Sequence, residues 1–311
     1  MSRKLKFDLT VDTNALLCPN PQEFYSKAYI TEEIADNYRT LPGIKSATKV
    51  ANVVFDDVLK ASTCNFTEAD QNLDAIDVDV APLSAMAEIC RFDIESSFLS
   101  MQMAKGSNGS FEVPAFMAYY WDEMAKEVAE EIAILRWVGD TAGATGTFLD
   151  LVDGHEKQLL ADADVVKIDA VAITSANVLA QMQDVYESLE PKLQQNKADL
   201  RFHVSSNVAT AYELAAASGN TIAFVTESLG MTYLGVKIVV NPGMSDNTMV
   251  LTRKDNLIYG FDGEGDGKAL KAVNLEDSVA EPLLRTRANL KVGFQHANPT
   301  EIVLYHEDVT P

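Results

Sequence analysis

Cysteine is scarce in this sequence, which has Cys18, Cys64 and Cys90 and no others. The number is odd and the spacing is wide. The three residues therefore form neither the paired pattern of a disulfide framework nor the close pairs of a zinc site. This usage favours a protein of a reducing compartment.

Long hydrophobic runs are also missing. No stretch approaches 18 consecutive apolar residues, although 47% of the 311 residues are hydrophobic, so we expect no membrane span. Basic residues Arg3, Lys4 and Lys6 near the start are not followed by an apolar run, and we therefore expect no secretory signal. The length is sufficient for one large or two modest domains with a substantial core.

Positive charge is in short supply, with 25 Lys and Arg against 46 Asp and Glu, a net charge of −21. A protein that grips DNA phosphates over a broad surface is expected to be basic, so this balance argues against that role. The charge is uneven along the chain. Residues 1–49 carry a net charge of +1, residues 50–170 carry −16 and the remainder carries −6. Either the nearly neutral leader lies on the acidic surface of a neighbouring copy, or it is a less charged edge of one domain.

Recognisable catalytic and cofactor motifs are absent from the sequence. There is no HExxH pair, GxSxG elbow, GxxxxGK[ST] phosphate loop or GxGxxG after a strand. The glycines of residues 143–146 indicate a loop without the lysine of a phosphate cradle, and the acidic pairs Asp56-Asp57 and Glu130-Glu131 are read as solvated faces. The histidines have no short ligand spacing; they are His155, His203, His296 and His306. We predict no enzyme, and no catalytic, cofactor-binding or metal-binding residue.

One acidic motif resembles the opening of a calcium loop. Oxygen-bearing Asp262, Glu264 and Asp266 occupy the first, third and fifth positions, and Gly267 occupies the sixth, as in such loops. The twelfth position, however, is Val273 where a bidentate glutamate is needed, and no helical pattern precedes the motif. An acidic turn is the favoured interpretation, with a weak cation site as the alternative.

Periodicity predicts the elements of the first half. Residues 1–48 indicate an extended arm with a short helix around Glu32–Tyr38. The runs Val50–Phe55 and Ile76–Val80 predict a hairpin, since the second alternates apolar and acidic residues with period two. A helix is predicted over Leu83–Met103, and a longer one runs from Pro114 to Val138, with an apolar stripe at helical spacing and Gly139 as its stop.

The second half mixes helices and strands, which gives an α+β fold. Thr174 is predicted to cap a helix with the stripe Val178, Met182, Val185 and Leu189, and Pro191 to end it. A strand at Leu200–Val204 precedes a helix at Asn207–Ala217. Further strands are predicted at Val236–Val240, Met249–Leu251, Leu257–Tyr259, Leu290–Phe294 and Ile302–Tyr305.

This order of elements, an arm, an extended hairpin, a long helix and a mixed second half, resembles the major capsid proteins of tailed bacteriophages, the Hong-Kong-type or Johnson fold. Local phrases also resemble that family. Val80–Leu83 leading to Glu88–Cys90 resembles the passage out of the hairpin, and Trp137–Asp140 resembles the end of the long helix. The other similar phrases are Phe202–Asn207, Leu234–Val239, Thr248–Leu251, Asn256–Gly260, Arg285–Asn289 and Val292–Gln295.

The resemblance implies a division of the chain in the family's terms. Residues 1–48 would be the N-terminal arm, 49–83 the E-loop hairpin, and 84–172 the peripheral domain with the spine helix at 114–138. Residues 173–280 would be mostly the axial domain, and 281–311 would return as strands to the peripheral domain. Some members cross-link through an E-loop lysine, for which Lys49 and Lys60 are candidates, but we predict no cross-link because the sequence identifies no partner. Such a short arm also suggests a separate scaffold protein or none.

The implied function is self-assembly into hexamers and pentamers of an icosahedral shell around double-stranded DNA, without sequence-specific binding. The location would be the virion capsid, assembled in the cytoplasm of a bacterial host. Further partners would be scaffold, portal and decoration proteins. Two alternatives stay open: an encapsulin-type nanocompartment shell, which shares the fold, and an acidic calcium-binding protein or metal-dependent enzyme centred on Asp262–Asp266.

Overall fold

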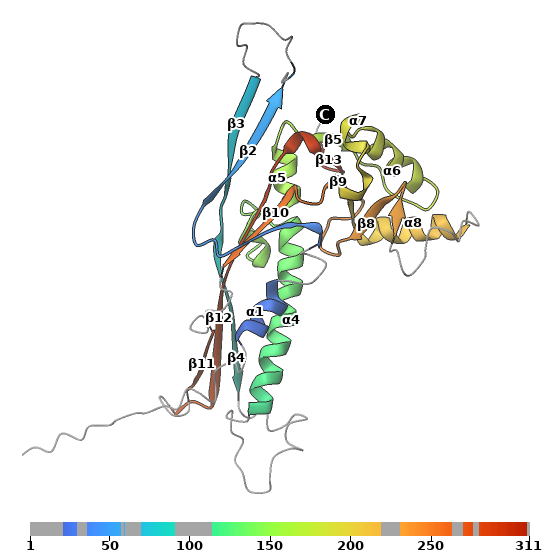
Figure 1. Cartoon of the computed structure of the whole chain (residues 1–311). Helices are drawn as coiled ribbons and strands as arrows, with labels where there is room; N and C mark the ends of the chain where they lie inside the picture. Colours follow the sequence, from blue (N-terminus) through green and yellow to red (C-terminus); the bar gives the residue numbers. More distant parts are fainter. Residues whose placement is uncertain are drawn as a thin grey trace, which may run out of the picture. The chain divides into compact units, whose positions relative to one another are not determined.

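The structure is a computed structural model (Figure 1) that describes residues 21–29, 36–56, 59, 70–90, 114–218, 231–262, 270–275 and 280–309. The chain divides into two compact units. Unit 1 comprises Met1–Tyr29, Pro82–Ala129 and Gly263–Leu290, and unit 2 comprises Ile30–Ala81, Glu130–Asp262 and Lys291–Pro311. Within the described ranges, no helix is long and apolar enough to cross a membrane.

Unit 1 contains a small sheet in which β12 (Leu283–His296) pairs on one side with β11 (Leu270–Asn274) and on the other with β4 (Ala81–Cys90). The β11–β12 ladder is antiparallel and runs from Leu270 opposite Ala288 to Asn274 opposite Leu284. Even-numbered residues of β11 and of this part of β12 are buried, and odd-numbered residues 271, 273, 285 and 287 are exposed. One face of the sheet is therefore covered and the other is open to solvent.

Among its described residues, unit 1 has the helices α1 (Pro21–Tyr29) and the first part of α4 (Pro114–Val138). Phe24 of α1 packs edge-on against Trp121 of α4 with ring centroids 5.6 Å apart, and Lys27 pairs with Asp122. The α1 helix corrects the expectation of an extended arm for this segment. Its local reason is the spacing of buried Phe24 and Ala28 on one helical face, after a proline at the first helical position.

Helix α4 begins and ends at the predicted residues. Met117, Trp121, Val128, Ile132 and Leu135 of the predicted stripe are buried, whereas Tyr120 and Met124 are half-buried. The amide of Gly139 donates to the carbonyl of Leu135, and a Cβ at Gly139 would lie 2.2 Å from the carbonyl oxygen of Val152. Gly139 therefore ends the helix and also allows the close return of the chain.

The helix predicted over Leu83–Met103 is wrong in its first part, because residues 81–90 form strand β4. Burial along β4 alternates with period two, with Ser84, Met86 and Glu88 exposed and the intervening side chains half-buried. Pairing with β12, nearly two hundred residues away in sequence, fixes this alternation. Residues 91–113, the rest of the predicted helix, lie outside the described ranges.

Besides a two-stranded hairpin at residues 48–78, unit 2 contains strands of two larger sheets. In one, β1 (Arg39–Pro42) runs parallel to β10 (Leu257–Asp262), which pairs antiparallel with Lys291–His296 of β12. The other has the order β5-β13-β9-β6-β8-β7. Its strands are β5 (Val166–Asp169), β6 (Leu200–Val204), β7 (Thr232–Tyr233), β8 (Val236–Val240), β9 (Met249–Arg253) and β13 (Val303–His306).

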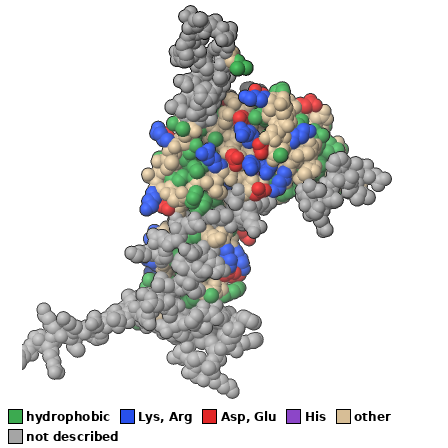
Figure 2. Space-filling model, in the orientation of Figure 1, with side chains coloured by type: hydrophobic (Ala, Val, Ile, Leu, Met, Phe, Trp, Pro, Cys, Tyr) green, Lys and Arg blue, Asp and Glu red, His purple; other side chains and the backbone are tan. Residues whose placement is uncertain are grey.

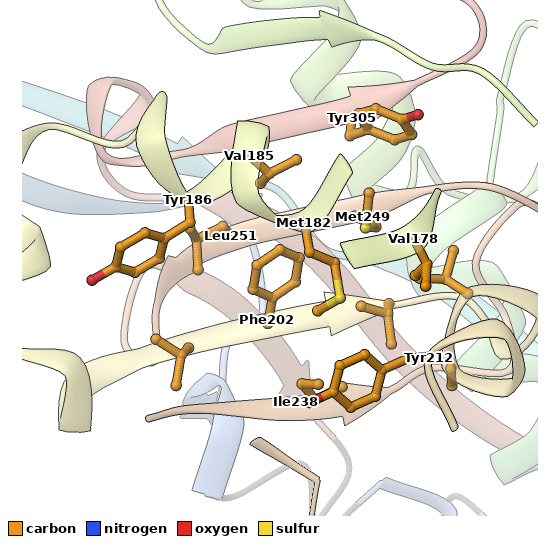
Figure 3. Close-up of a cluster of buried hydrophobic side chains, with 14 of the residues drawn as sticks. Val178, Met182, Val185, Tyr186, Phe202, Tyr212, Ile238, Met249, Leu251 and Tyr305 are labelled. Atoms are coloured by element: carbon orange, nitrogen blue, oxygen red, sulfur yellow. The ribbon is translucent and has the colours of Figure 1, made fainter. Parts of the chain in front are cut away.

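The main core of unit 2 lies between the six-stranded sheet and helices α6 (Val178–Glu187) and α8 (Ser206–Ser218). Figure 3 shows Val178, Met182 and Val185 of α6 above Phe202 and Leu251 of the sheet. Because side chains alternate along a strand, Phe202 and Tyr305 enter this core, whereas His203 and His306 point to the opposite face. The other helices among the described residues of unit 2 are α5 (His155–Ala161) and α7 (Pro191–Gln194), with short 3-10 turns at Phe148–Asp150, Lys197–Asp199 and Pro299–Glu301.

A two-stranded hairpin leaves this body, formed by β2 (Thr48–Asp56) and β3 (Asp70–Val78) (Figure 1). The ladder runs in register from Thr48 opposite Val78 to Asp56 opposite Asp70, so the predicted pairing of the two runs is confirmed. At its base, Val50 and Val78 join a small core with Ile44 and Ile258. A Cβ at Gly293 of β12 would lie 2.0 Å from the carbonyl oxygen of Asp79, so glycine there permits the hairpin base to approach the sheet.

The remaining predicted elements can be compared directly. Strands β6 and β8 have the predicted bounds, and β9, β10 and β12 extend further than predicted. Helix α6 begins at Val178 rather than near Thr174, because the carbonyl of Thr174 accepts the amides of Asn177 and Val178 in a preceding turn. The short helix expected around Glu32–Tyr38 lies mostly outside the described residues.

Candidate functional site

All four histidines of the sequence gather around the short helix α5. His155 is its first residue and is fully buried. His203 of β6 approaches from the sheet, and both imidazoles pack on the ring of Trp137, with centroids 5.4 and 5.5 Å away. Their positions come from the folding together of distant segments, which explains why their sequence spacing carries no signal. We call this group, with Tyr38 and Arg136, the histidine cluster.

The two inner imidazoles of the histidine cluster are held in the neutral form. Burial lowers the pKa of His203 to about 3 and, helped by the positive charge of Arg136, lowers the pKa of His155 well below its usual value. Neither nitrogen of His155 has a hydrogen-bond partner among the described residues, nor does Nε2 of His203. The guanidinium of Arg136 lies 4.6 Å from the centre of the Tyr38 ring. Protonation of either imidazole would place a second positive charge near Arg136 in a buried site, which would destabilise the folded chain.

The other two histidines each face a carboxylate at one end of α5, Glu156 in its first turn or Asp162 just after its last residue. Nε2 of His296 lies 2.9 Å from Asp162, and Nε2 of His306 lies 3.6 Å from Glu156. In the neutral imidazole, Nδ1 of His306 accepts a hydrogen bond from the amide of Asp308 at 3.0 Å, and Nε2 then carries the proton that faces Glu156. The nearby Glu156 carboxylate raises the pKa of His306 above its usual value. These pairs fix both ends of α5.

A polar pocket of about 650 Å³ opens beside α5. Glu156, Lys157, Lys167, Ser245 and His306 contribute polar groups to its lining. Most of these groups already have partners: Glu156 accepts the amide and hydroxyl of Ser245 at 2.9 and 2.6 Å, and Lys157 pairs with Asp140 and Asp153, both at 2.6 Å. The polar groups of the pocket thus bond mainly to one another. Because its lining carries both positive and negative side chains, it favours neither an anionic nor a cationic ligand.

The other candidates from the sequence have ordinary structural roles or lie outside the described ranges. The loop at residues 143–146 is braced by Asp150, whose carboxylate accepts the Gly146 amide at 2.7 Å and so occupies the position that a phosphate would need. Lys49 pairs with Asp77 at 3.5 Å, on the exposed surface of the hairpin. Asp57, Lys60 and the acidic turn after Asp262 are not described. In the described part of the chain, no group of three or more His, Cys, Asp or Glu side chains is placed to hold a metal ion.

Surface charge in unit 2 is mixed. Figure 2 shows Lys and Arg interspersed with Asp and Glu over the face of this unit that it draws. Ion pairs within unit 2 join Lys237 with Asp36 at 2.8 Å and Arg253 with Glu301 at 3.3 Å. The mixed charge of the drawn face (Figure 2) differs from the basic patch that a phosphate backbone would need.

Two features of the fold are suited to contacts with other chains. The β2–β3 hairpin is a two-stranded sheet, without a third strand among the described residues, and such a ribbon is only marginally stable alone in water. In unit 1, the open face of the sheet exposes Met86 and Val273, which are 70% and 46% accessible. The hairpin and the open sheet face are therefore candidate contact surfaces for other chains.

Comparison with known proteins identifies the fold. No family model matches the sequence, and no curated protein matches it. Among solved structures, a chain of the satellite phage P4 procapsid that includes the size determination (Sid) protein matches with a TM-score of 0.61 and 12% identity, over 92% of this chain and 97% of that one. The capsid of a native GTA particle matches with a TM-score of 0.58 and 15% identity, over 90% of each chain.

A chain from a structure of Mycobacterium phage Che8 is also similar, with a TM-score of 0.53 and 14% identity over 92% of each chain. The chain therefore has the mixed helix and sheet fold of phage capsid proteins along about 90% of its length. The resemblance that the sequence predicts is confirmed at the level of the fold. These solved structures are structural capsid proteins and not enzymes.

Proposed function

We propose that this chain is a major capsid protein of a tailed bacteriophage, which assembles as hexamers and pentamers into an icosahedral shell that encloses double-stranded DNA. The observation that carries the proposal is the likeness of fold to the P4 procapsid chain, which covers 92% of this chain and 97% of the other. The virion capsid is the proposed location, after assembly in the cytoplasm of the bacterial host. Scaffold, portal and decoration proteins are the proposed additional partners.

In this proposal the elements take the roles that the sequence resemblance implies. The β2–β3 hairpin is the E-loop within residues 49–83, and α4 is the spine helix of a peripheral domain at residues 84–172. Residues 1–48 act as the arm, residues 173–280 form most of the axial domain, and residues 281–311 return to the peripheral domain. The hairpin supports this scheme because its strands, apart from their base, require a surface that another copy can supply.

Assembly would use heterologous contacts, in which one patch of a subunit meets a different patch of its neighbour. Each contact would bury on the order of 800 Å² per partner. Because several contacts connect the same subunits, each contact raises the effective concentration of the others. The net charge of −21 suits an enclosed genome that must move in and out, since the shell would repel DNA over most of its surface.

Sedimentation velocity of the purified chain at increasing concentration tests this function. We expect capsomers, tubes or shells to replace the monomer cooperatively, either alone or after co-expression with a scaffold protein. A chain that remains monomeric at high concentration under both conditions would contradict the proposal. Nuclease-protected DNA in particles purified from phage-producing cells would support genome enclosure, whereas particles filled with a protein cargo would indicate the nanocompartment alternative.

A further inference from the structure

The open face of the unit 1 sheet combines an apolar groove with unneutralised positive charge. The groove has a volume of about 480 Å³ and lies between β4, β11 and β12. Met86 and Val273 contribute exposed apolar side chains to it. The charged side chains around it are Glu88, Lys271, Arg285 and Arg287. We call this surface the outer sheet face.

Two cations on the outer sheet face stand directly opposite each other. Lys271 of β11 is the cross-strand partner of Arg287 of β12, and both side chains are exposed on the same side. Like charges in this relationship destabilise a sheet. A sequence selected only for stability of the subunit would place a carboxylate or a neutral residue at one of the two positions.

No carboxylate of the described residues forms an ion pair with Lys271 or Arg287. Glu88, the one acidic residue at the groove, pairs with Arg285. Arg287 donates to the amide oxygen of Asn289 at 2.8 Å and to the hydroxyl of Ser84 at 3.1 Å, both neutral groups. Lys271 has no ion-pair partner among the described residues. Among the side chains that line the groove, three cations face one carboxylate, an excess of two positive charges, in a chain whose net charge is −21. Glu281, outside the groove, acts on Arg285 rather than on the Lys271–Arg287 pair.

We propose that the outer sheet face docks an acidic, amphipathic segment of a second copy of this chain, which seats an apolar side chain between Met86 and Val273 and places carboxylates on Lys271 and Arg287. This inference rests on the proposed function, for which it identifies one of the heterologous contacts. A second copy fits by charge. Each copy has 46 acidic and 25 basic side chains, so the acidic surface of one copy is attracted to the positively charged outer sheet face of another.

The apolar groove favours a protein segment over a nucleic acid. A phosphodiester backbone would satisfy the two cations but would leave Met86 and Val273 without an apolar partner. Methionine and arginine are enriched in protein interfaces, where an apolar centre is surrounded by polar groups. The outer sheet face has this composition, with Met86 at the groove and Arg285 and Arg287 beside it.

Charge reversal of Lys271 separates binding from folding. In Lys271→Glu, the like-charge pair with Arg287 becomes an opposite-charge pair, so we expect the thermal midpoint of the unassembled subunit to be unchanged or higher. We also expect the concentration at which assembly begins to rise by at least about tenfold, because the variant repels the acidic segment. Lys192→Glu on α7 is the matched control, since Lys192 is an exposed lysine of unit 2, and it should shift assembly by less than about twofold.

Met86→Ser provides a second variant without a change of charge, and it should also weaken assembly while the subunit remains folded. A wild-type chain that never assembles would overturn both this inference and the proposed function. If the wild type assembles and the Lys271→Glu and Met86→Ser variants assemble equally well, the inference is wrong and the proposed function stands. Equal losses in Lys271→Glu and Lys192→Glu would indicate a general charge effect and overturn it. The inference is also overturned if Lys271→Glu assembles like the wild type but no longer binds a short DNA duplex that the wild type binds.

Discussion

His306 and Glu156 form a buried pair in which Nε2 of the imidazole lies 3.6 Å from a carboxylate oxygen, with 7% and 5% of the two side chains exposed. The same carboxylate accepts the amide and hydroxyl of Ser245. One acidic group therefore connects β13, α5 and the turn that follows β8. A buried charge with several partners is costly to leave unpaired, which makes this pair a sensitive point of unit 2.

The His306–Glu156 pair should make the stability of unit 2 decrease as the pH rises above neutral. The nearby Glu156 carboxylate raises the pKa of His306 above its ordinary value of 6.5. Stabilisation from the pair is thus fully present below pH 6.5 and is lost as the pH rises through the raised pKa. In Glu156→Gln, we expect the free energy of unfolding at pH 6 to fall by about 1–3 kcal/mol, and its decline above pH 6.5 to flatten. Urea unfolding between pH 5 and 9 measures both.

The control for this variant is Glu301→Gln, which breaks the more exposed pair with Arg253 and should cost no more than about 1 kcal/mol. A Glu156→Gln variant that retains the pH profile of the wild type would show that His306 does not titrate against Glu156.

The histidine cluster should make unit 2 sensitive to acid. Burial lowers the pKa of His203 to about 3 and lowers that of His155 well below 6.5. Both residues therefore bind protons more readily in the unfolded chain, and stability that is present above pH 6.5 is lost as the pH falls. Each such imidazole contributes a slope of about 1.4 kcal/mol per pH unit.

Replacing His155 with phenylalanine tests this account. The His155→Phe variant removes two buried nitrogens that have no partners among the described residues and keeps an aromatic ring between Trp137 and Phe294. We expect its unfolding free energy to fall less steeply than that of the wild type between pH 6 and 4, by about 1.4 kcal/mol per pH unit. Denaturant unfolding across this range gives the slope. An unchanged slope would mean that His155 does not remain neutral in the folded chain.

Gly293 should be irreplaceable at the base of the hairpin. A Cβ there would lie 2.0 Å from the carbonyl oxygen of Asp79, so we expect Gly293→Ala to displace the hairpin and cost more than about 3 kcal/mol. Gly235→Ala is the control, because a Cβ at Gly235 meets only the end of the Lys197 side chain at 3.6 Å. We therefore expect Gly235→Ala to cost only the backbone strain of an alanine at the positive φ of 86°, about 1–2 kcal/mol. Equal thermal midpoints for the two variants would contradict the close packing at Gly293.

Local periodicity accounts for the parts of the fold that the sequence predicts well. Helix α4 buries residues at 3.6-residue spacing and ends at a glycine, so its bounds follow from nearby residues alone. Strand β6 alternates apolar residues with Arg201 and His203, and β8 is a short, mostly apolar run; both are bounded by turns or helices. The β2–β3 pairing follows from the alternation around Ile76, which Val50 opposes in the ladder.

The errors arise where distant segments decide the structure. Residues 83–90 contain Ala, Leu, Met and Glu, which favour helices, yet pairing with β12 makes them a strand. The short strands β1 and β5 each pair with a partner far away in sequence, whereas β11 pairs with the nearby β12. Four or five residues carry too little periodicity to identify any of these three strands. The histidine cluster was missed for the same reason, since three sheet strands and two helices bring its rings together.

The central claim, that copies of this chain close into a shell, is tested most directly by electron microscopy of the purified assembled protein. We expect closed particles of uniform size whose reconstruction shows capsomers with fivefold and sixfold arrangements of one subunit. Monomers at high concentration with or without scaffold, or open filaments built from a single repeating contact, would contradict it.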